Sequence, residues 1–402
     1  MSIFCVVIAD SEEIPEEFLE IVKKGSKEKK NGVLTKRKLN FDVIIVEDSE
    51  QFYKMEDEVF RSFVIGDSDY CSEAMPLSDG IFTTRNNVVN KQYKNFERHF
   101  GNLSYYGEKR WRSEENEYLD LLANVLTNGE LRSTRNAMTY SIFGSNIEFN
   151  LKNFPLLTTK KMFFRGVVEE LLFFLRGETN TKILEEKGIN IWKGNTSREF
   201  LDSVGLKDYQ EGDMGPTYGF NWRYYGAEYQ GCDKNYKGQG IDQLEKLIDK
   251  LCNKPTDRRL VMTTWDIRTV DKAVLPPCHG LVDQFYVSKG KLSCKVYQRS
   301  ADLVLGLPFN IASYAALVHI LCVICTNRGY PLTPGKLFIS LGDAHVYQEH
   351  EEGAIEQLFR IPFDFPQLSV VSTAKTVEEL SFGDFKLSNY EFYPPVKVDM
   401  IA

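Results

Sequence analysis

The sequence contains no apolar segment long enough to cross a membrane. Its longest apolar run, residues 312–325, includes His319 and falls short of the roughly 20 residues that a spanning helix needs. No basic segment followed by an apolar one opens the chain, so we expect no secretory signal. We therefore interpret the run as a helix of the protein core.

The sequence also has few cysteines and no excess of positive charge. Eight cysteines in 402 residues do not suggest a disulfide framework, which favours a reducing, cytoplasmic location. The pair Cys322 and Cys325 has no second pair and no nearby histidine set, so we expect no metal there. The 49 basic against 57 acidic residues give a net charge of −8, which argues against broad binding to nucleic acid or anionic membranes.

The apolar and charged fractions, 43% and 26%, are typical of globular proteins, and the length allows two domains. Residues 1–107 are predicted to form a small α/β unit with a linker at its end. Its strands are expected at residues 2–9, 41–46, 62–66 and 80–85, and its helix at 16–24. We interpret residues 25–38 as a solvated loop and residues 86–112 as the linker.

Residues 108–402 are expected to form a second domain, in which helix and strand patterns both occur. The predicted helices are 118–127, 166–175, 241–251 and 311–326. The predicted strands, apart from the hairpin described next, are 140–149, 261–265 and 337–341.

One hairpin dominates this second part. Cys278 follows two prolines, which stiffen its approach, and strands are predicted at 280–287 and 292–298 around a turn at Lys289-Gly290. Counting from the turn places Cys278 opposite Ala301, or opposite Ser300 if one residue is bulged out. Arg299 would then lie close to the thiol and stabilise its thiolate, so Cys278 is interpreted as a nucleophile and not as a structural cysteine.

Other polar residues in this part have two interpretations each. Of Glu169 and Glu170, on a mostly apolar helix, we expect one to face solvent and the other a cavity. Arg258 and Arg259 are either solvated or forked donors for a phosphate. Asn310 is either an N-cap or an amide that offers donors and an acceptor to a ligand.

A hydrolase that pairs Cys278 with His279 is disfavoured, because adjacent residues of a strand point to opposite faces. His345 and Tyr347 alternate at the end of a strand and are expected to point the same way.

Several blocks, in order, resemble the thymidylate synthase family from about Gly107 onward. They are FPLLTTKK, EELLFFL, DMGPTYGFNWR, DRRL, LPPCH, YQRSADLVLGLPFNIASY and GDAHVY. The first unit resembles dihydrofolate reductase at residues 63–67, 75–77 and 81–85, as in bifunctional enzymes that join the two. However, Asp67 stands where that family has the second glycine of a pair, so we interpret residues 1–107 as a non-catalytic remnant.

The resemblance implies the synthase fold for residues 108–402, an α+β domain with a mixed sheet packed against helices and with the sheets back to back in a homodimer. It also implies methylation of dUMP by 5,10-methylenetetrahydrofolate without a metal. The implied catalytic residues are Cys278, Glu170, Tyr218, Asn310, Arg299 and His279. The implied nucleotide contacts are Arg135, Arg258, Arg259, Arg299, Ser300, Asn310, His345 and Tyr347, with Arg258 and Arg259 reaching the partner's site. The implied folate contacts are Asp302, Ile191, Trp192, Leu305, Phe309, Lys160 and Ala402.

Departures from the family pattern keep two alternatives open. The loop around Arg135 lacks the family's glycines, and the strand after His279 carries one extra residue near Val282-Asp283, consistent with a bulge. A deoxycytidylate hydroxymethylase would share the thiolate, but that specificity goes with a carboxylate in place of Asn310. A non-catalytic nucleotide- or RNA-binding protein is suggested by the Arg135 loop and opposed by the otherwise complete catalytic set.

Overall fold

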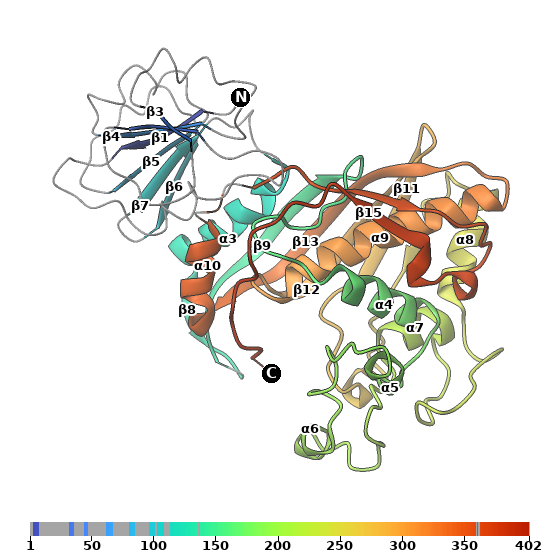
Figure 1. Ribbon diagram of the computed structural model, residues 1–402. Coiled ribbons are helices and arrows are strands. Elements are labelled where there is room, and N and C mark those ends of the chain that lie inside the picture. The colour runs from blue at the N-terminus through green and yellow to red at the C-terminus, as the bar shows by residue number, and fades with distance from the viewer. Residues whose placement is uncertain are drawn as a thin grey trace.

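The computed structural model of the chain describes residues 113–401, apart from Asn136, Phe359 and Ile361, and seven strands before them (Figure 1). These strands form one sheet in the order β3-β2-β4-β1-β5-β7-β6, in which β1 to β5 are parallel and β6 and β7 antiparallel. Their bounds are β1 Ile3–Val7, β2 Gly32–Thr35, β3 Ile44–Val46, β4 Ser62–Gly66, β5 Gly80–Thr84, β6 Phe96–Phe100 and β7 Leu103–Gly107.

This first sheet confirms the four predicted strands and corrects two predictions. Strand β2 lies within the predicted loop 25–38, and β6 and β7 lie within the predicted linker 86–112. The sheet therefore continues to Gly107. The helix predicted at residues 16–24 lies outside the described residues.

The second sheet has six strands in the order β10-β11-β12-β13-β9-β8. Strands β12 and β13 are parallel and the other neighbours antiparallel, so the sheet is mixed as predicted. The bounds are β8 Glu130–Ser133, β9 Met138–Asn150, β10 Val261–Met262, β11 Val282–Ser288, β12 Lys291–Asp302 and β13 Thr333–Tyr347. A separate pair is formed by β14 Gln367–Val370 and β15 Phe385–Ser388.

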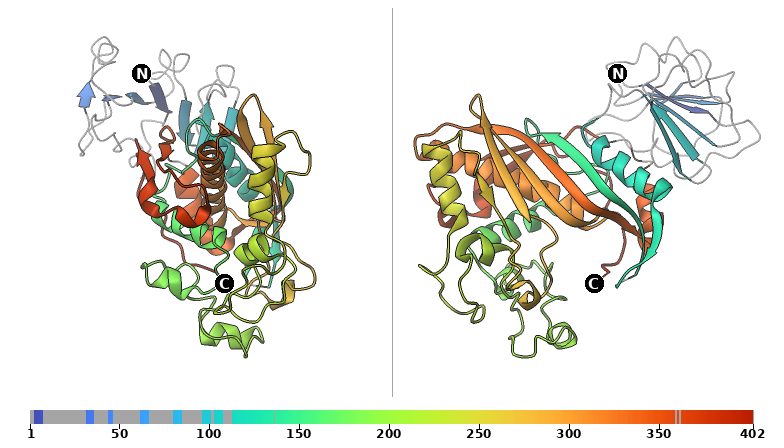
Figure 2. Two further views of the ribbon diagram at one scale, coloured as in Figure 1. Left: turned by 90° about the vertical axis from the view of Figure 1, so that its right-hand side faces the viewer. Right: turned by 180° about the vertical axis from the view of Figure 1, so that it is seen from behind.

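Helices cover one face of this mixed sheet (Figures 1 and 2). Of these, α3 Asn116–Asn128 and α9 Gly306–Asn327 make the most contacts with the sheet. The other helices are α4 Phe164–Leu175, α5 Lys182–Glu185, α6 Arg198–Ser203, α7 Tyr218–Tyr224, α8 Gln243–Asn253 and α10 Glu351–Leu358. The predicted helices 118–127, 166–175 and 241–251 correspond to α3, α4 and α8. The predicted strand 261–265 is shorter, because β10 ends at Met262.

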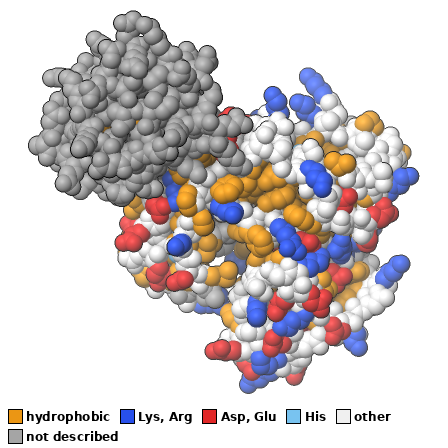
Figure 3. Space-filling view, viewed as in Figure 1, with side chains coloured by type: hydrophobic (Ala, Val, Ile, Leu, Met, Phe, Trp, Pro, Cys, Tyr) orange, Lys and Arg blue, Asp and Glu red, His pale blue; other side chains and the backbone are white. Residues whose placement is uncertain are grey.

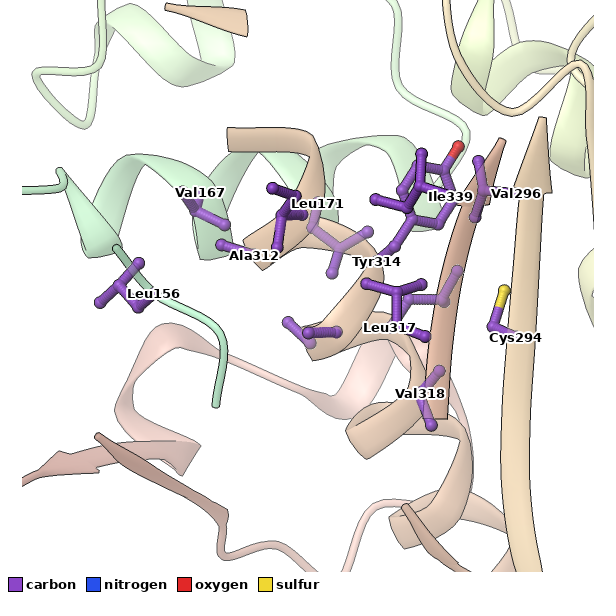
Figure 4. Close-up of a cluster of buried hydrophobic side chains, with 14 of the residues drawn as sticks. Leu156, Val167, Leu171, Cys294, Val296, Ala312, Tyr314, Leu317, Val318 and Ile339 are labelled. Carbon is purple, nitrogen blue, oxygen red and sulfur yellow. The ribbon is translucent and has the colours of Figure 1, made fainter. Parts of the chain in front are cut away.

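Helix α9 is the centre of the core. It packs against β12 and β13 on one side and against α4 and α8 on others. Figure 4 shows Ala312, Tyr314, Leu317 and Val318 of this helix among apolar side chains of the neighbouring elements. Within the part of the chain that the structure describes, α9 is the one helix whose length and hydropathy would suit a membrane span, and most of it is buried inside the protein.

Helix α9 begins five residues earlier than predicted, at Gly306. Asn310 therefore lies inside the first turns of the helix and is not its N-cap. The carboxylate of Asp302 accepts hydrogen bonds from the backbone N–H groups of Val304 and Leu305, at 2.9 and 3.2 Å, just before the helix. A side-chain oxygen thus satisfies backbone donors at this end from farther upstream than the sequence suggested.

The opposite face of the mixed sheet presents exposed apolar side chains. Val282 and Tyr297 are direct partners across β11 and β12, and Tyr286 lies on the same face as Val282 because side chains alternate along a strand. Val261 pairs with Gln284 and so shares this face. The four side chains are 40–68% exposed. We call Val261, Val282, Tyr286 and Tyr297 the outer apolar face; Figure 2 (right) views the sheet from behind.

Charged side chains of both signs are mixed on the surface seen in Figure 3. Lysine, arginine, aspartate and glutamate side chains intermingle over its lower part, and apolar side chains gather in its middle. On this face, the described residues therefore carry no extended patch of positive charge of the kind that tracks a nucleic-acid backbone.

Candidate active site

The hairpin of β11 and β12 forms as predicted. Lys289 and Gly290 have φ values of 50° and 73°, which suits a two-residue turn, and Ser288 pairs with Lys291 across it. The predicted partner of Cys278 is wrong, however. The ladder ends at Val282, Gly280 takes a φ of 67°, and the carbonyl of Cys278 accepts from the backbone N–H of Arg299 at 2.9 Å. The irregular residues before β11 thus bring Cys278 level with Arg299, not with Ala301 or Ser300.

The side chain of Arg299 holds the segment that carries Cys278. Its Nε donates to the carbonyl of Pro277 and its Nη2 to the carbonyl of Pro276, both at 2.9 Å. The guanidinium carbon lies 5.8 Å from the ring centroid of Trp265. Because the two proline rings fix φ and the two hydrogen bonds hold the carbonyl groups, the segment before Cys278 has little freedom left to move.

Two atoms of Cys278, its backbone nitrogen and its sulfur, contact the hydroxyl group of Tyr218. Its backbone N–H donates to Oη of Tyr218 at 3.2 Å, and Oη lies 3.4 Å from Sγ. Burial raises the pKa of the Cys278 thiol, while the hydrogen bond from Tyr218 and the charge of Arg299 lower it. The expected effect of Arg299 is present, but burial outweighs it, so the pKa of the thiol in the isolated chain lies above its ordinary value.

Close packing of two helices positions Tyr218, the first residue of α7. A Cβ on Gly219 would lie 2.4 Å from the carbonyl oxygen of Phe174 in α4, so only glycine allows this approach. The ring of Tyr218 stacks on Phe174 at 5.0 Å between centroids and on His279 at 4.5 Å. Burial raises the pKa of Tyr218 well above its ordinary value, so its hydroxyl remains protonated and able to donate.

The two adjacent glutamates of α4 have different partners. Glu169 is buried and forms an ion pair with Lys187 at 2.6 Å, and Glu170 is half-buried. The prediction that one of the two glutamates faces solvent is therefore wrong. Glu170 accepts a hydrogen bond from Nε1 of Trp192 at 2.6 Å. Burial raises the pKa of Glu170 to about 7, which suits a group that exchanges protons at neutral pH.

The imidazole of His279 is not hydrogen-bonded to the thiol of Cys278. Its Nδ1 lies 3.0 Å from Oη of Tyr314, whereas the hydroxyl bonded to Cys278 belongs to Tyr218. Burial lowers the pKa of His279 to about 3, so the imidazole is neutral. This geometry does not support a cysteine hydrolase.

Further predicted residues lie at the ends of β12, β13 and α9, and Ile191 and Trp192 lie between α5 and α6. His345 and Tyr347 point the same way, as predicted, with ring centroids 5.3 Å apart, and Nδ1 of His345 lies 3.1 Å from Oδ1 of Asp343. The remaining ones share a half-buried side chain, which leaves each partly open to a ligand. They are Ile191, Trp192, Ser300, Asp302, Leu305, Phe309 and Asn310.

Other predicted residues lie apart or outside the description. Arg258 and Arg259 are exposed, and Arg259 pairs with Asp257 in its own turn at 3.0 Å. Arg135 is exposed between β8 and β9. Lys160 is buried and donates to the carbonyl of Val304, and burial lowers its pKa to about 8. Ala402 lies outside the described residues.

Sequence reasoning missed three residues beside Cys278 and His279. Trp265 faces Arg299, Tyr314 bonds to His279, and Asp283 is fully buried behind them. The extra residue noted near Val282-Asp283 was the one signal in the sequence that marked this place. Among the described residues, no cluster of histidine, cysteine and carboxylate side chains could hold a metal ion.

Comparison with known proteins agrees with this arrangement. The sequence model of the family described as thymidylate synthase matches residues 116–402. A thymidylate synthase of Herpesvirus ateles is 48% identical over 288 residues, which are 71% of this chain and 97% of that protein. Bifunctional dihydrofolate reductase-thymidylate synthases are 50% identical in Daucus carota, over 72% of this chain and 54% of that protein, and 43% identical in Paramecium tetraurelia, over 79% and 67%.

The chain thus spans about half the length of the plant bifunctional relatives that it matches. The match covers most of the described second part, including the hairpin with Cys278, the Tyr218 helix and helix α9. From the extent of this match, the chain belongs to the thymidylate synthase family.

Proposed function

We propose that this chain converts dUMP to dTMP, taking the methyl group from 5,10-methylenetetrahydrofolate and releasing dihydrofolate. The observation that carries the proposal is the setting of Cys278. Its thiol lies against the hydroxyl of Tyr218, on a segment that Arg299 ties down through two carbonyl groups. A fixed sulfur with a polar partner is the requirement for attack on a pyrimidine ring.

The nucleophile acts at C6 of the uracil ring. Cys278 loses its proton, and its sulfur bonds to C6, so that the electrons of the C5–C6 double bond pass toward O4 as an enolate. The amide of Asn310, half-buried in the first turns of α9, is suited to donate to O4 and so stabilise this charge. Carbon C5 then gains the nucleophilic character that an unactivated uracil lacks.

Two protein groups handle protons in this scheme. After C5 has bonded to the methylene carbon of the folate, a water molecule held by the neutral hydroxyl of Tyr218 would take the C5 proton, and the bond from that carbon to the folate nitrogen breaks. The folate then gives a hydride to the same carbon, and the sulfur leaves C6 as the C5–C6 double bond returns. Glu170, whose pKa is raised to about 7 by burial, both holds and releases a proton near neutral pH. His279 is placed beside Tyr218 by ring stacking and belongs to the same network.

The folate co-substrate supplies both the one-carbon unit and the hydride, so the proposal needs no nicotinamide and no metal at this site. Half-buried side chains offer an apolar wall for its rings: Ile191, Trp192, Leu305 and Phe309. One oxygen of Asp302 is engaged by backbone N–H groups at the start of α9, which orients the carboxylate for a pterin. Contacts from Lys160 and Ala402 remain predictions.

We infer that the active unit is a homodimer whose sheets meet at the outer apolar face. Single exposed apolar residues are ordinary, but four on one face of a sheet favour a protein interface. The guanidinium groups of Arg258 and Arg259 are exposed, and Arg259 would exchange its ion pair with Asp257 for a nucleotide phosphate in the partner. Arg299, Ser300, His345, Tyr347 and Arg135 would complete the nucleotide contacts.

We also propose that residues 1–107 are a reductase-like unit without reductase activity and that the synthase domain comprises residues 108–402. The strand order with an antiparallel pair at one edge supports a common sheet for the first unit. The acidic Asp67 would oppose a cofactor phosphate at that position. A cytoplasmic location follows from cysteine usage and remains part of this proposal.

Trapping of Cys278 tests the function directly. The purified chain is incubated with 5-fluoro-dUMP and 5,10-methylenetetrahydrofolate, denatured, and analysed by mass spectrometry of its peptides. Because the fluorine on C5 cannot be removed as a proton is, the expected result is a stable adduct of nucleotide and folate on Cys278.

The matched control is Cys278→Ser, which should bind nucleotide but form no adduct. An adduct on another residue, or nucleotide binding without any adduct in the unaltered chain, would contradict the proposal; the second outcome would favour a non-catalytic binding protein. Turnover of dCMP without dihydrofolate release would favour the hydroxymethylase.

A further inference from the structure

Asp283 is a buried carboxyl group without an ordinary reason to be buried. It lies on β11 with its side chain on the inner face of the sheet, at 0% exposure. Neither of its side-chain oxygens completes a hydrogen bond among the described residues. A buried polar group with no partner costs stability, so its presence calls for a role that offsets this cost.

The nearest polar group is the hydroxyl of Tyr314, on α9. A Cβ on Gly280 would lie 2.4 Å from Oη of Tyr314 and 3.1 Å from Oδ2 of Asp283, so both oxygens border the same small space. The hydroxyl approaches closely enough to affect the pKa of Asp283, although the geometry falls short of a full hydrogen bond. Glycine at position 280, with its φ of 67°, leaves room for the pair.

Tyr314 connects this carboxyl group to the proposed active site. Its Oη lies 3.0 Å from Nδ1 of His279, and the imidazole stacks on Tyr218 at 4.5 Å. Tyr218 in turn contacts Sγ of Cys278 at 3.4 Å. A continuous set of contacts therefore runs from Asp283 to the sulfur, and Figure 4 shows Tyr314 with its hydroxyl at the edge of the apolar cluster.

The protonation of Asp283 decides the direction of the hydrogen bonds in this set. A neutral carboxylic acid donates to Tyr314, whose own hydrogen then goes to Nδ1 of His279 and leaves the proton of the imidazole on Nε2. An ionised carboxylate would accept from Tyr314, and Nδ1 of His279 would then have to carry the hydrogen. The two states of Asp283 therefore correspond to opposite tautomers of His279.

The surroundings favour the neutral acid. The titratable groups that face Asp283 are Tyr314 from α9 and Cys294 from β12, whose pKa values are both raised by burial and by the charge of Asp283. Burial raises the pKa of Asp283 well above its ordinary value, and among the described residues no cation offsets this effect. Burial in an apolar setting without a cation thus favours the neutral acid over the carboxylate.

We propose that Asp283 is a positioning residue: as a neutral acid it completes, by a small movement, the hydrogen bond to Tyr314 whose geometry falls short here, and Tyr314 donates to His279, which fixes the imidazole with its proton on Nε2. The effect on turnover rests on the proposed function, since His279 belongs to the network around Cys278. The residue does not touch the substrate, and it acts only through Tyr314 and His279.

Nitrogen-15 NMR of the full chain labelled in its five histidines tests the tautomer without any turnover. His279→Gln identifies the His279 signals. We expect the Nε2–H form in the unaltered chain and in Asp283→Asn, whose amide can still donate, with kcat within about threefold. Asp283→Leu should give a mixture of tautomers and lower kcat about tenfold, the size of one lost hydrogen bond, with the nucleotide KM little changed.

If Asp283→Leu does not fold, Tyr314→Phe provides the same test. It removes one oxygen atom and interrupts the same set of contacts. It should change the His279 tautomer as Asp283→Leu does. An Nδ1–H tautomer in the unaltered chain would overturn the proposal, and so would a fixed Nε2–H form in Tyr314→Phe. A chain that shows the expected tautomers but no methyl transfer would contradict the proposed function alone.

Discussion

The hydroxyl group of Tyr218 accepts from the backbone N–H of Cys278 and lies 3.4 Å from its sulfur. Because the backbone group already supplies one hydrogen to Oη, the tyrosine's own hydrogen is available to the sulfur. The same residue thus fixes where Cys278 lies and stabilises the charge that its sulfur must carry.

Replacing Tyr218 by phenylalanine tests this double role. We expect Tyr218→Phe to raise the pKa of the Cys278 thiol, since a hydrogen bond that favours the thiolate is lost. Alkylation of Cys278 by iodoacetamide at pH 8 should slow by about three- to tenfold, and kcat should fall by about a hundredfold. The control is Tyr224→Phe, which makes the same change on α7; equal effects of the two variants would refute the assignment.

Glu170 is expected to make stability depend on pH in a defined window. Its pKa of about 7 in the folded chain exceeds the ordinary 4.5, so the folded state holds a proton that the unfolded chain releases between these values. The free energy of unfolding of the unaltered chain should therefore fall, relative to Glu170→Gln, as pH rises from 4.5 to 7, by at most about 3 kcal/mol. Urea unfolding at pH 5 and pH 8 measures this difference; parallel behaviour of the two proteins would contradict it.

Shared active sites predict that two inactive variants restore activity together. The Cys278→Ser chain lacks the nucleophile, and a chain with Arg258→Ala and Arg259→Ala lacks the arginines offered to the partner. After joint unfolding and refolding at equal amounts, about half of the dimers are mixed and each contains one complete site. We expect about a quarter of the normal methyl transfer, whereas arginines that serve only their own subunit's site would yield no recovery. Refolding each variant alone gives the baseline.

The first unit is expected to lack reductase activity. When the full chain is mixed with NADPH and dihydrofolate, the absorbance of NADPH should decline no faster than it does without the chain. Addition of an active dihydrofolate reductase to the same mixture serves as the positive control. A decline that requires both substrates and this chain would show that residues 1–107 are catalytic after all.

The sequence predicted the parts of this site that depend on local chemistry. The turn at Lys289-Gly290 and the helices α3, α4 and α8 follow from backbone preference and apolar spacing. The register at Cys278 was missed because the φ of Gly280 breaks the two-for-one counting on which it depended. The start of α9 was missed because its first turn, from Gly306 to Asn310, contains a glycine and a proline and precedes the continuous apolar run.

Strands β2 and β6 were missed for a different reason. The sequence around Gly32–Thr35 is rich in lysine, and Phe96–Phe100 carries charged residues, so neither segment has the apolar pattern of a buried strand. Strand β2 forms through its pairing with β3 and β4, and strand β6 forms through its pairing with β7. Such partners cannot be identified from a local pattern.

Helix α9 has consequences for the synthesis of the chain. The ribosome completes this apolar helix before β13, one of the strands that cover it, has been made. Until β13 has been made, helix α9, whose hydropathy would suit a membrane span, is covered by only some of the elements that bury it in the folded protein. Until that last long strand emerges, the earlier elements β12, α4 and α8 are the ones that can cover α9.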